Sequence, residues 1–167
     1  MISQKVELRF DTFDVLQKND SGPDEPYIWT FFVKLDGTIN FLDPNFTIPV
    51  FSPPGSHGDL NLPHGEVISQ DPPAPIPEDV GRCKFILENH TGINRIDPQM
   101  AVAALIVAFE EDTFPSTAKM EEARRTLREA LSTQVTQLVH NAIQGLDVDF
   151  DDVSVEDIKE PVLKVLK

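Results

Sequence analysis

The sequence predicts a mainly antiparallel β-sandwich with one long amphipathic helix inserted near the C-terminus. Two segments rich in aromatic and β-branched residues, 5–16 and 27–36, flank a Gly-, Pro- and Asp-rich turn, as neighbouring antiparallel strands do. Two more apolar segments, 82–88 and 101–109, predict further strands, and helical spacing over 117–144 predicts the helix. The alternative is a two-layer α+β arrangement in which the helix covers one face of a single sheet.

Length and charge limit the class of protein. The 167 residues are enough for one domain with its own core. Asp and Glu number 28 against 14 Lys and Arg, a net charge of −14, which argues against nucleic acid and makes membrane contact unexpected. Cys83 is the single cysteine and no signal pattern opens the chain, so a reducing, cytoplasmic location is expected.

The first two strands differ in their patterns. In the first, Val6, Leu8 and Phe10 alternate with charged residues, as expected for a half-buried strand. The segment 27–36 is almost wholly apolar, which predicts a central strand covered on both faces. An Asp-Gly pair at its end predicts a hairpin turn into a short strand over 38–42.

Prolines dominate the next part of the chain. Region 43–80 carries nine of them, which disfavours helix and interior strands, so it is predicted to be mainly loop. Short extended pieces at 46–51 and 65–69 are candidate edge strands. The apolar strand 101–109 is predicted to be deeply buried.

The helix is predicted to end at Gly145 and to bury one apolar stripe, with positions such as Arg124 and Glu129 exposed. At roughly 40 Å it exceeds a strand of about 20 Å, so the end of the stripe should overhang the sheet. An overhanging apolar stripe predicts an interface with a second copy or another protein. The residues concerned are Leu138, Val139, Ala142 and Ile143. Residues 145–167 are predicted to form an acidic loop and a last strand.

Acidic residues gather at two places that a sheet can bring together. The first hairpin carries carboxylate and amide oxygens, and Glu110 and Asp112 follow the strand 101–109. Calcium prefers several such hard oxygen ligands. If the two loops converge, they form a calcium site; the alternative is that both are ordinary solvated loops. The hairpin residues are Asn19, Asp20, Asp24 and Glu25.

The stretch from Val6 to Thr30, with DSGPDEPY between two strands, resembles the opening of a C-two domain, the calcium- and lipid-binding β-sandwich. The acidic residues that end the segment 105–112 resemble that family's later loop. Glu stands for Asp in two places, the first loop is shorter, and the helix has no counterpart in the family core. The resemblance implies a β-sandwich architecture most strongly, calcium binding less strongly, and docking to a membrane least.

Other chemistry is sparse. His57 and His64 fit no established metal spacing, and Cys83 in an apolar strand is more typical of a core residue. We find no phosphate-binding loop, nucleophile elbow or small-molecule site. The chain is therefore predicted to be a non-enzymatic binding module with a calcium-type site, or alternatively an assembly protein that uses its helix and sheet edges. An enzyme acting through Cys83, His57 or His64 ranks third.

Overall fold

The computed structural model describes residues 2–13, 26–53, 74–76, 78–89, 100–110, 117–145 and 164. Small antiparallel sheets and one long helix make up this part of the chain, which confirms the predicted antiparallel strands and helix. The described residues form a mixed α+β fold with a β majority. The elements are β1 (Ile2–Arg9), β2 (Thr12–Phe13), β3 (Pro26–Leu35), β4 (Val50–Phe51), β5 (Ala74–Pro75), α1 (Glu78–Gly81), β6 (Arg82–Asn89), β7 (Ala101–Glu110) and α2 (Thr117–Ile143).

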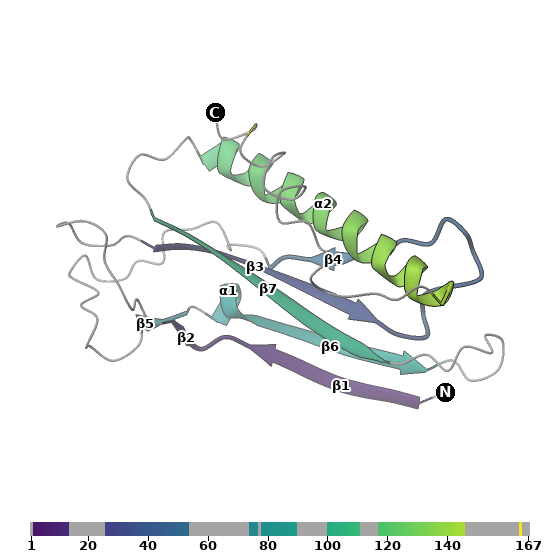
Figure 1. Ribbon diagram of the computed structural model, residues 1–167. Coiled ribbons are helices and arrows are strands. Elements are labelled where there is room, and N and C mark those ends of the chain that lie inside the picture. Colours follow the sequence, from purple (N-terminus) through teal and green to yellow (C-terminus); the bar gives the residue numbers. More distant parts are fainter. Residues whose placement is uncertain are drawn as a thin grey trace.

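The elements lie in three layers (Figure 1). The middle layer is a three-stranded sheet in the order β4-β3-β7. Helix α2 covers one face of this sheet, and a two-stranded antiparallel ribbon of β1 and β6 lies on the other. Strand β3 is therefore central and covered on both faces, as its apolar sequence predicts.

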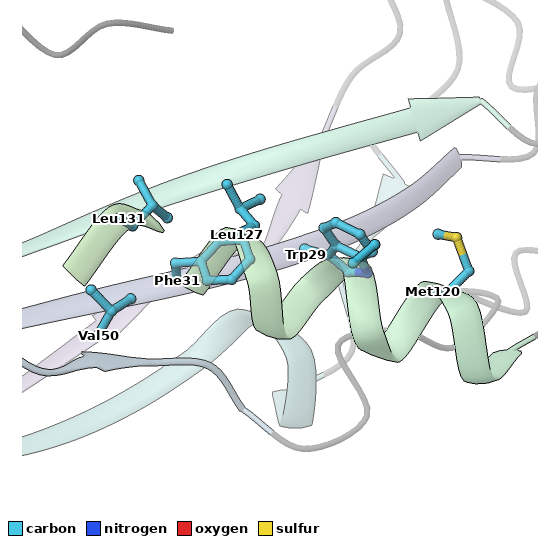
Figure 2. Close-up of a cluster of buried hydrophobic side chains, with 7 residues drawn as sticks. Trp29, Phe31, Val50, Met120, Leu127 and Leu131 are labelled. Carbon is cyan, nitrogen blue, oxygen red and sulfur yellow. The ribbon is translucent and has the colours of Figure 1, made fainter. Parts of the chain in front are cut away.

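The core between helix and sheet uses every second residue of β3 (Figure 2). Trp29 and Phe31 are buried and point toward the helix, where Leu127 and Leu131 contact them. Successive side chains of a strand point to opposite faces, so the odd-numbered residues of β3 face the helix and do not contribute to the core on the other face of the sheet. Burying a side chain of this size contributes about 1.5–3 kcal/mol, so this layer accounts for much of the stability of the fold.

The even-numbered residues of β3 face the ribbon. The ring of Phe32 lies 6.0 Å from that of Phe10 and 6.3 Å from that of Phe85, centroid to centroid. Val6 and Leu8 pack into the same cluster, which confirms the predicted alternation of the first strand. Thr30 is also buried, and its hydroxyl donates to the carbonyl of Val80.

The predicted strand 5–16 is wrong in its extent. Strand β1 ends at Arg9, and the two residues of β2 pair with β5 instead of continuing along β6. The break occurs where the Phe10 N–H donates to the carbonyl of Gly81 (2.8 Å). A Cβ at position 81 would meet the Phe10 carbonyl oxygen, so glycine permits this crossing. Residues 14–16 lie outside the described part of the chain.

The predicted strand 38–42 is also wrong. Bends and turns follow β3, because side-chain oxygens capture backbone N–H groups that a strand would need. Asp36 accepts from the N–H of Thr38, and Asn40 accepts from the N–H of Leu42. These local bonds turn the chain back toward the helix.

Helix α2 runs from Thr117 to Ile143, close to the predicted bounds. Gly145 follows in the left-handed conformation at φ 73°, the usual helix stop. Arg124, predicted to be exposed, is buried, and its guanidinium is paired with Glu121 one turn earlier. Its long aliphatic stem covers apolar surface while its charge stays paired.

The buried residues of α2 lie in its first half, and the segment around Ile48 covers much of the second. Ser132 donates to the Ile48 carbonyl, and the Ile48 N–H donates to Thr136 Oγ1 (2.8 Å). The Phe46 ring stacks on His140 with centroids 4.2 Å apart. The chain itself therefore covers part of the helix that reaches beyond the sheet. Of the two predicted extended pieces, 46–51 contains β4, whereas 65–69 lies outside the described residues.

Candidate interaction site on the edge strand β7

Strand β7 is the feature that departs most from prediction. It was expected to be deeply buried, but it pairs only with β3 among the described residues and so forms one edge of the sheet. Leu105 on the helix side is 40% exposed and Ile106 on the ribbon side is 38% exposed. The prediction failed because a continuous apolar run does not distinguish an interior strand from one at the edge of the sheet.

The position of the two covering layers explains this exposure. The backbone of α2 approaches β4 more closely than β7, and the ribbon approaches the sheet through β6 and β3. Neither layer is centred over β7, so Leu105 on the helix side and Ile106 on the ribbon side stay partly exposed. Val107, which packs against the helix-side core, is the better covered part of the strand.

The other described sheet edges carry the usual protection against pairing with another chain. Strand β4 has two residues and stands between Pro49 and Pro53. The ribbon strands carry charged residues, and Arg82 of β6 pairs with Glu7 of β1 at 2.7 Å. Short edges, prolines and charges all discourage strand addition. Residues 101–109 of β7 contain no charged residue and no proline.

Backbone geometry shows which groups of β7 face outward. Ser52, directly after β4, donates its hydroxyl to the carbonyl of Thr30 (2.9 Å), so that carbonyl points toward β4. Because backbone groups alternate along a strand, those of Phe31 point toward β7, where Phe31 is opposite Leu105. Leu105 therefore bonds to β3. The N–H and C=O groups of Ala104 and Ile106 are directed to the open edge.

The predicted calcium ligands lie mostly outside the described residues. Asn19, Asp20, Asp24, Glu25 and Asp112 fall there, and for Glu110 the structure describes the backbone alone. Strand β7 pairs with the second predicted strand and not with the first. In that ladder Pro26, which follows Glu25 in the sequence, is opposite Glu110.

Asp36 is the one fully buried carboxylate among the described residues. It accepts hydrogen bonds from the Thr38 N–H (3.0 Å) and hydroxyl (2.6 Å), from the Glu88 N–H (2.9 Å), and from Lys34 Nζ (3.0 Å). Burial by itself raises the pKa of Asp36, but the bonds from Thr38, Glu88 and Lys34 outweigh burial and hold that pKa below its usual value. Every acceptor position is occupied by the fold, so this cluster ties the end of β3 to β6.

The interface predicted on the helix occupies its last turns. Leu138 and Val139 are half-buried, while Ala142 and Ile143 are exposed. No second chain is present, so their part in an assembly stays a prediction. Cys83 is half-buried in the ribbon core, where burial raises the pKa of its thiol, and His57 and His64 lie outside the described residues.

No family model, curated protein or solved structure matches the chain. Within the described residues, no group of three or more His, Cys, Asp or Glu side chains is placed to hold a metal ion. The same residues contain no helix both long and apolar enough to span a membrane.

Proposed function

We propose that this chain is a binding module that joins protein chains by adding a strand to the open edge of β7. The observation that carries the proposal is an edge strand, half exposed on both faces, whose nine residues 101–109 carry neither charge nor proline. An added strand would bond to the outward backbone groups of β7, and its side chains would cover Leu105 and Ile106. Main-chain bonds would supply affinity and the alternating side chains specificity.

Protection of the edge elsewhere supports this function. The chain uses prolines beside β4 and charges on the ribbon to keep other described edges unpaired. A long edge strand that lacks prolines and charges is an aggregation hazard unless a partner covers it. A strand-addition site requires an edge free of prolines and charges, and residues 101–109 of β7 have neither.

Hydrogen exchange tests the proposal directly. The probe is a labelled peptide of residues 101–109 flanked by lysines for solubility. We expect it to slow exchange at the outward amides of Ala104 and Ile106, while that of Leu105 is already slow because it bonds to β3. Ile106→Lys should abolish peptide binding measured by fluorescence anisotropy.

Ile86→Lys is the matched control, because Ile86 is an exposed isoleucine on the outer face of β6 (53% exposed). It should bind the peptide as the unmodified chain does. Equal loss in both variants, or no protection at Ala104 and Ile106, contradicts strand addition. Slow exchange at these two amides in the dilute chain alone contradicts it too, because the chain's own residues would then cover the edge.

Calcium binding is the second candidate function. The observation that favours it is the pairing of Pro26, the residue after Glu25, with Glu110, the first residue of the second acidic segment. These segments are the ones that resemble the loops of a C-two domain. A ligand that binds the native state alone stabilises it by about 2.7 kcal/mol at a hundredfold excess over Kd.

Thermal melting tests calcium binding with and without millimolar calcium. We expect calcium to raise the melting temperature, and Asp20→Asn and Asp112→Asn each to abolish the rise if both segments supply ligands. A melting temperature that neither calcium nor a chelator changes removes this function. If only Asp20→Asn matters, the two segments do not form one site.

A further inference from the structure

We infer that the strand added to β7 is β7 of a second copy of this chain, antiparallel, with a two-fold axis at Leu105. This inference rests on the proposed function and names the partner. The two copies would share one continuous sheet in the order β4-β3-β7-β7-β3-β4. A two-fold contact is self-complementary, so one sequence must supply both sides of the interface.

The sequence of β7 matches large residues to small ones about this axis. With Leu105 opposite its own copy, Ala104 lies opposite Ile106 and Ala103 lies opposite Val107. Each of these two pairs joins one small and one branched side chain, and the pair on the axis, Leu105 with its copy, sets two large side chains against each other. Directly opposed side chains on one face of a sheet contact each other, so these pairs decide the register.

The backbone allows this register, and side-chain size and paired length disfavour its neighbours. Ala104 and Ile106 both direct their hydrogen-bonding groups to the open edge, so they can bond to each other across the axis. An axis at Ile106 opposes large residues in more pairs than the proposed register does, because Ile106 meets itself and Leu105 meets Val107 on both sides of the axis. An axis at Ala104 leaves the last residues of the strand unpaired.

The lack of charge along the edge is compatible with an uncharged partner strand such as a second β7. With a net charge of −14, the chain attracts basic partners. A site that recognises a basic partner needs acidic residues along the binding edge to pair with that partner's charges. Residues 101–109 carry no charge, so the edge offers such a partner no specific contact. Two copies repel each other overall, and their contact is apolar. Added salt should therefore strengthen the dimer, because it screens the repulsion.

Cysteine cross-linking tests the register, in the full chain carrying Cys83→Ala. Across the axis, Leu105 and its copy form a pair without mutual hydrogen bonds, with Cα atoms about 4.5 Å apart, within the disulfide range. Leu105→Cys should therefore give a disulfide-linked dimer under mild oxidation. Ile106→Cys is the control, because the two copies of residue 106 would lie about 9 Å apart, too far for a disulfide.

Light scattering supplies the second measurement. The unmodified chain should have twice the monomer mass at high concentration, with a dimer that strengthens as salt increases, and Ile106→Lys should be a folded monomer. Efficient cross-linking of Ile106→Cys but not of Leu105→Cys overturns the register. A monomer at high concentration that still binds the β7 peptide overturns the second copy as partner while strand addition stands. A monomer that does not bind the peptide overturns both proposals.

Discussion

Replacing Asp36 with asparagine should destabilise the fold strongly although it removes almost no volume. An asparagine can present its oxygen either to the two donors of Thr38 or to the Glu88 N–H and Lys34, but not to both pairs. The carboxylate accepts from both pairs, at 2.6–3.0 Å. Two hydrogen bonds are therefore lost, and the asparagine NH₂ then faces other donors.

The size of the effect follows from these bonds. A hydrogen bond to a charged group contributes about 1.5–3 kcal/mol. Because Lys34 is partly exposed, the lower end applies, and we expect Asp36→Asn to cost about 3 kcal/mol of unfolding free energy. Typical domains have about 5–15 kcal/mol in total, so the loss is readily measured by urea unfolding.

Asp43→Asn is the matched control. Asp43 is exposed, and it accepts a single N–H bond from Asn45 (2.9 Å) that an asparagine oxygen can also accept. Its cost should stay below about 0.5 kcal/mol. The double variant Lys34→Met with Asp36→Asn should lose less unfolding free energy than the two single variants lose together. The reason is that Lys34→Met removes an N–H donor that the NH₂ group of the asparagine would otherwise face. Equal costs for the two aspartate variants would refute the reasoning.

The stability contributed by Asp36 depends on pH in a defined direction. Its pKa in the folded chain lies below the ordinary value, so the folded state binds the proton less tightly than the unfolded state. Its contribution is therefore fully present above the unfolded pKa of about 3.9 and is lost as the pH falls through the folded pKa. The stability difference between the unmodified chain and Asp36→Asn should shrink over that acid range. A constant difference would contradict the assignment.

Two further substitutions probe how α2 is held. Thr136→Val keeps the shape but leaves the Ile48 N–H without its acceptor, so it should cost about 1–3 kcal/mol in urea unfolding. Thr133→Val, on an exposed position, should cost less than about 0.5 kcal/mol, and similar values for both would show that this bond does not hold the segment. Leu127→Ala should cost about 2–5 kcal/mol because Leu127 is buried. Leu138→Ala should cost clearly less in the isolated chain because Leu138 is half-buried, and an equal cost would mean that the second half of α2 is packed as tightly as the first.

Local patterns were sufficient for much of the fold. The apolar run of β3 predicted a central strand, and helical spacing with a terminal glycine predicted α2 to within a residue at its end. The hairpin after Asp36 was mispredicted because an Asp-Gly pair also suits a turn whose side chain captures backbone donors. Arg124 was mispredicted because a long polar side chain can lie flat over apolar surface with its charge paired.

By itself the sequence determined the four long strands and helix α2, because periodicity and turn chemistry act between near neighbours along the chain. Only the tertiary structure decided which strand stands at the edge, since that depends on where distant layers are centred. The apolar sequence of β7 is equally compatible with a covered interior strand and an open edge, and α2 and the ribbon leave it half covered. The candidate binding surface is therefore a consequence of packing, not of a motif.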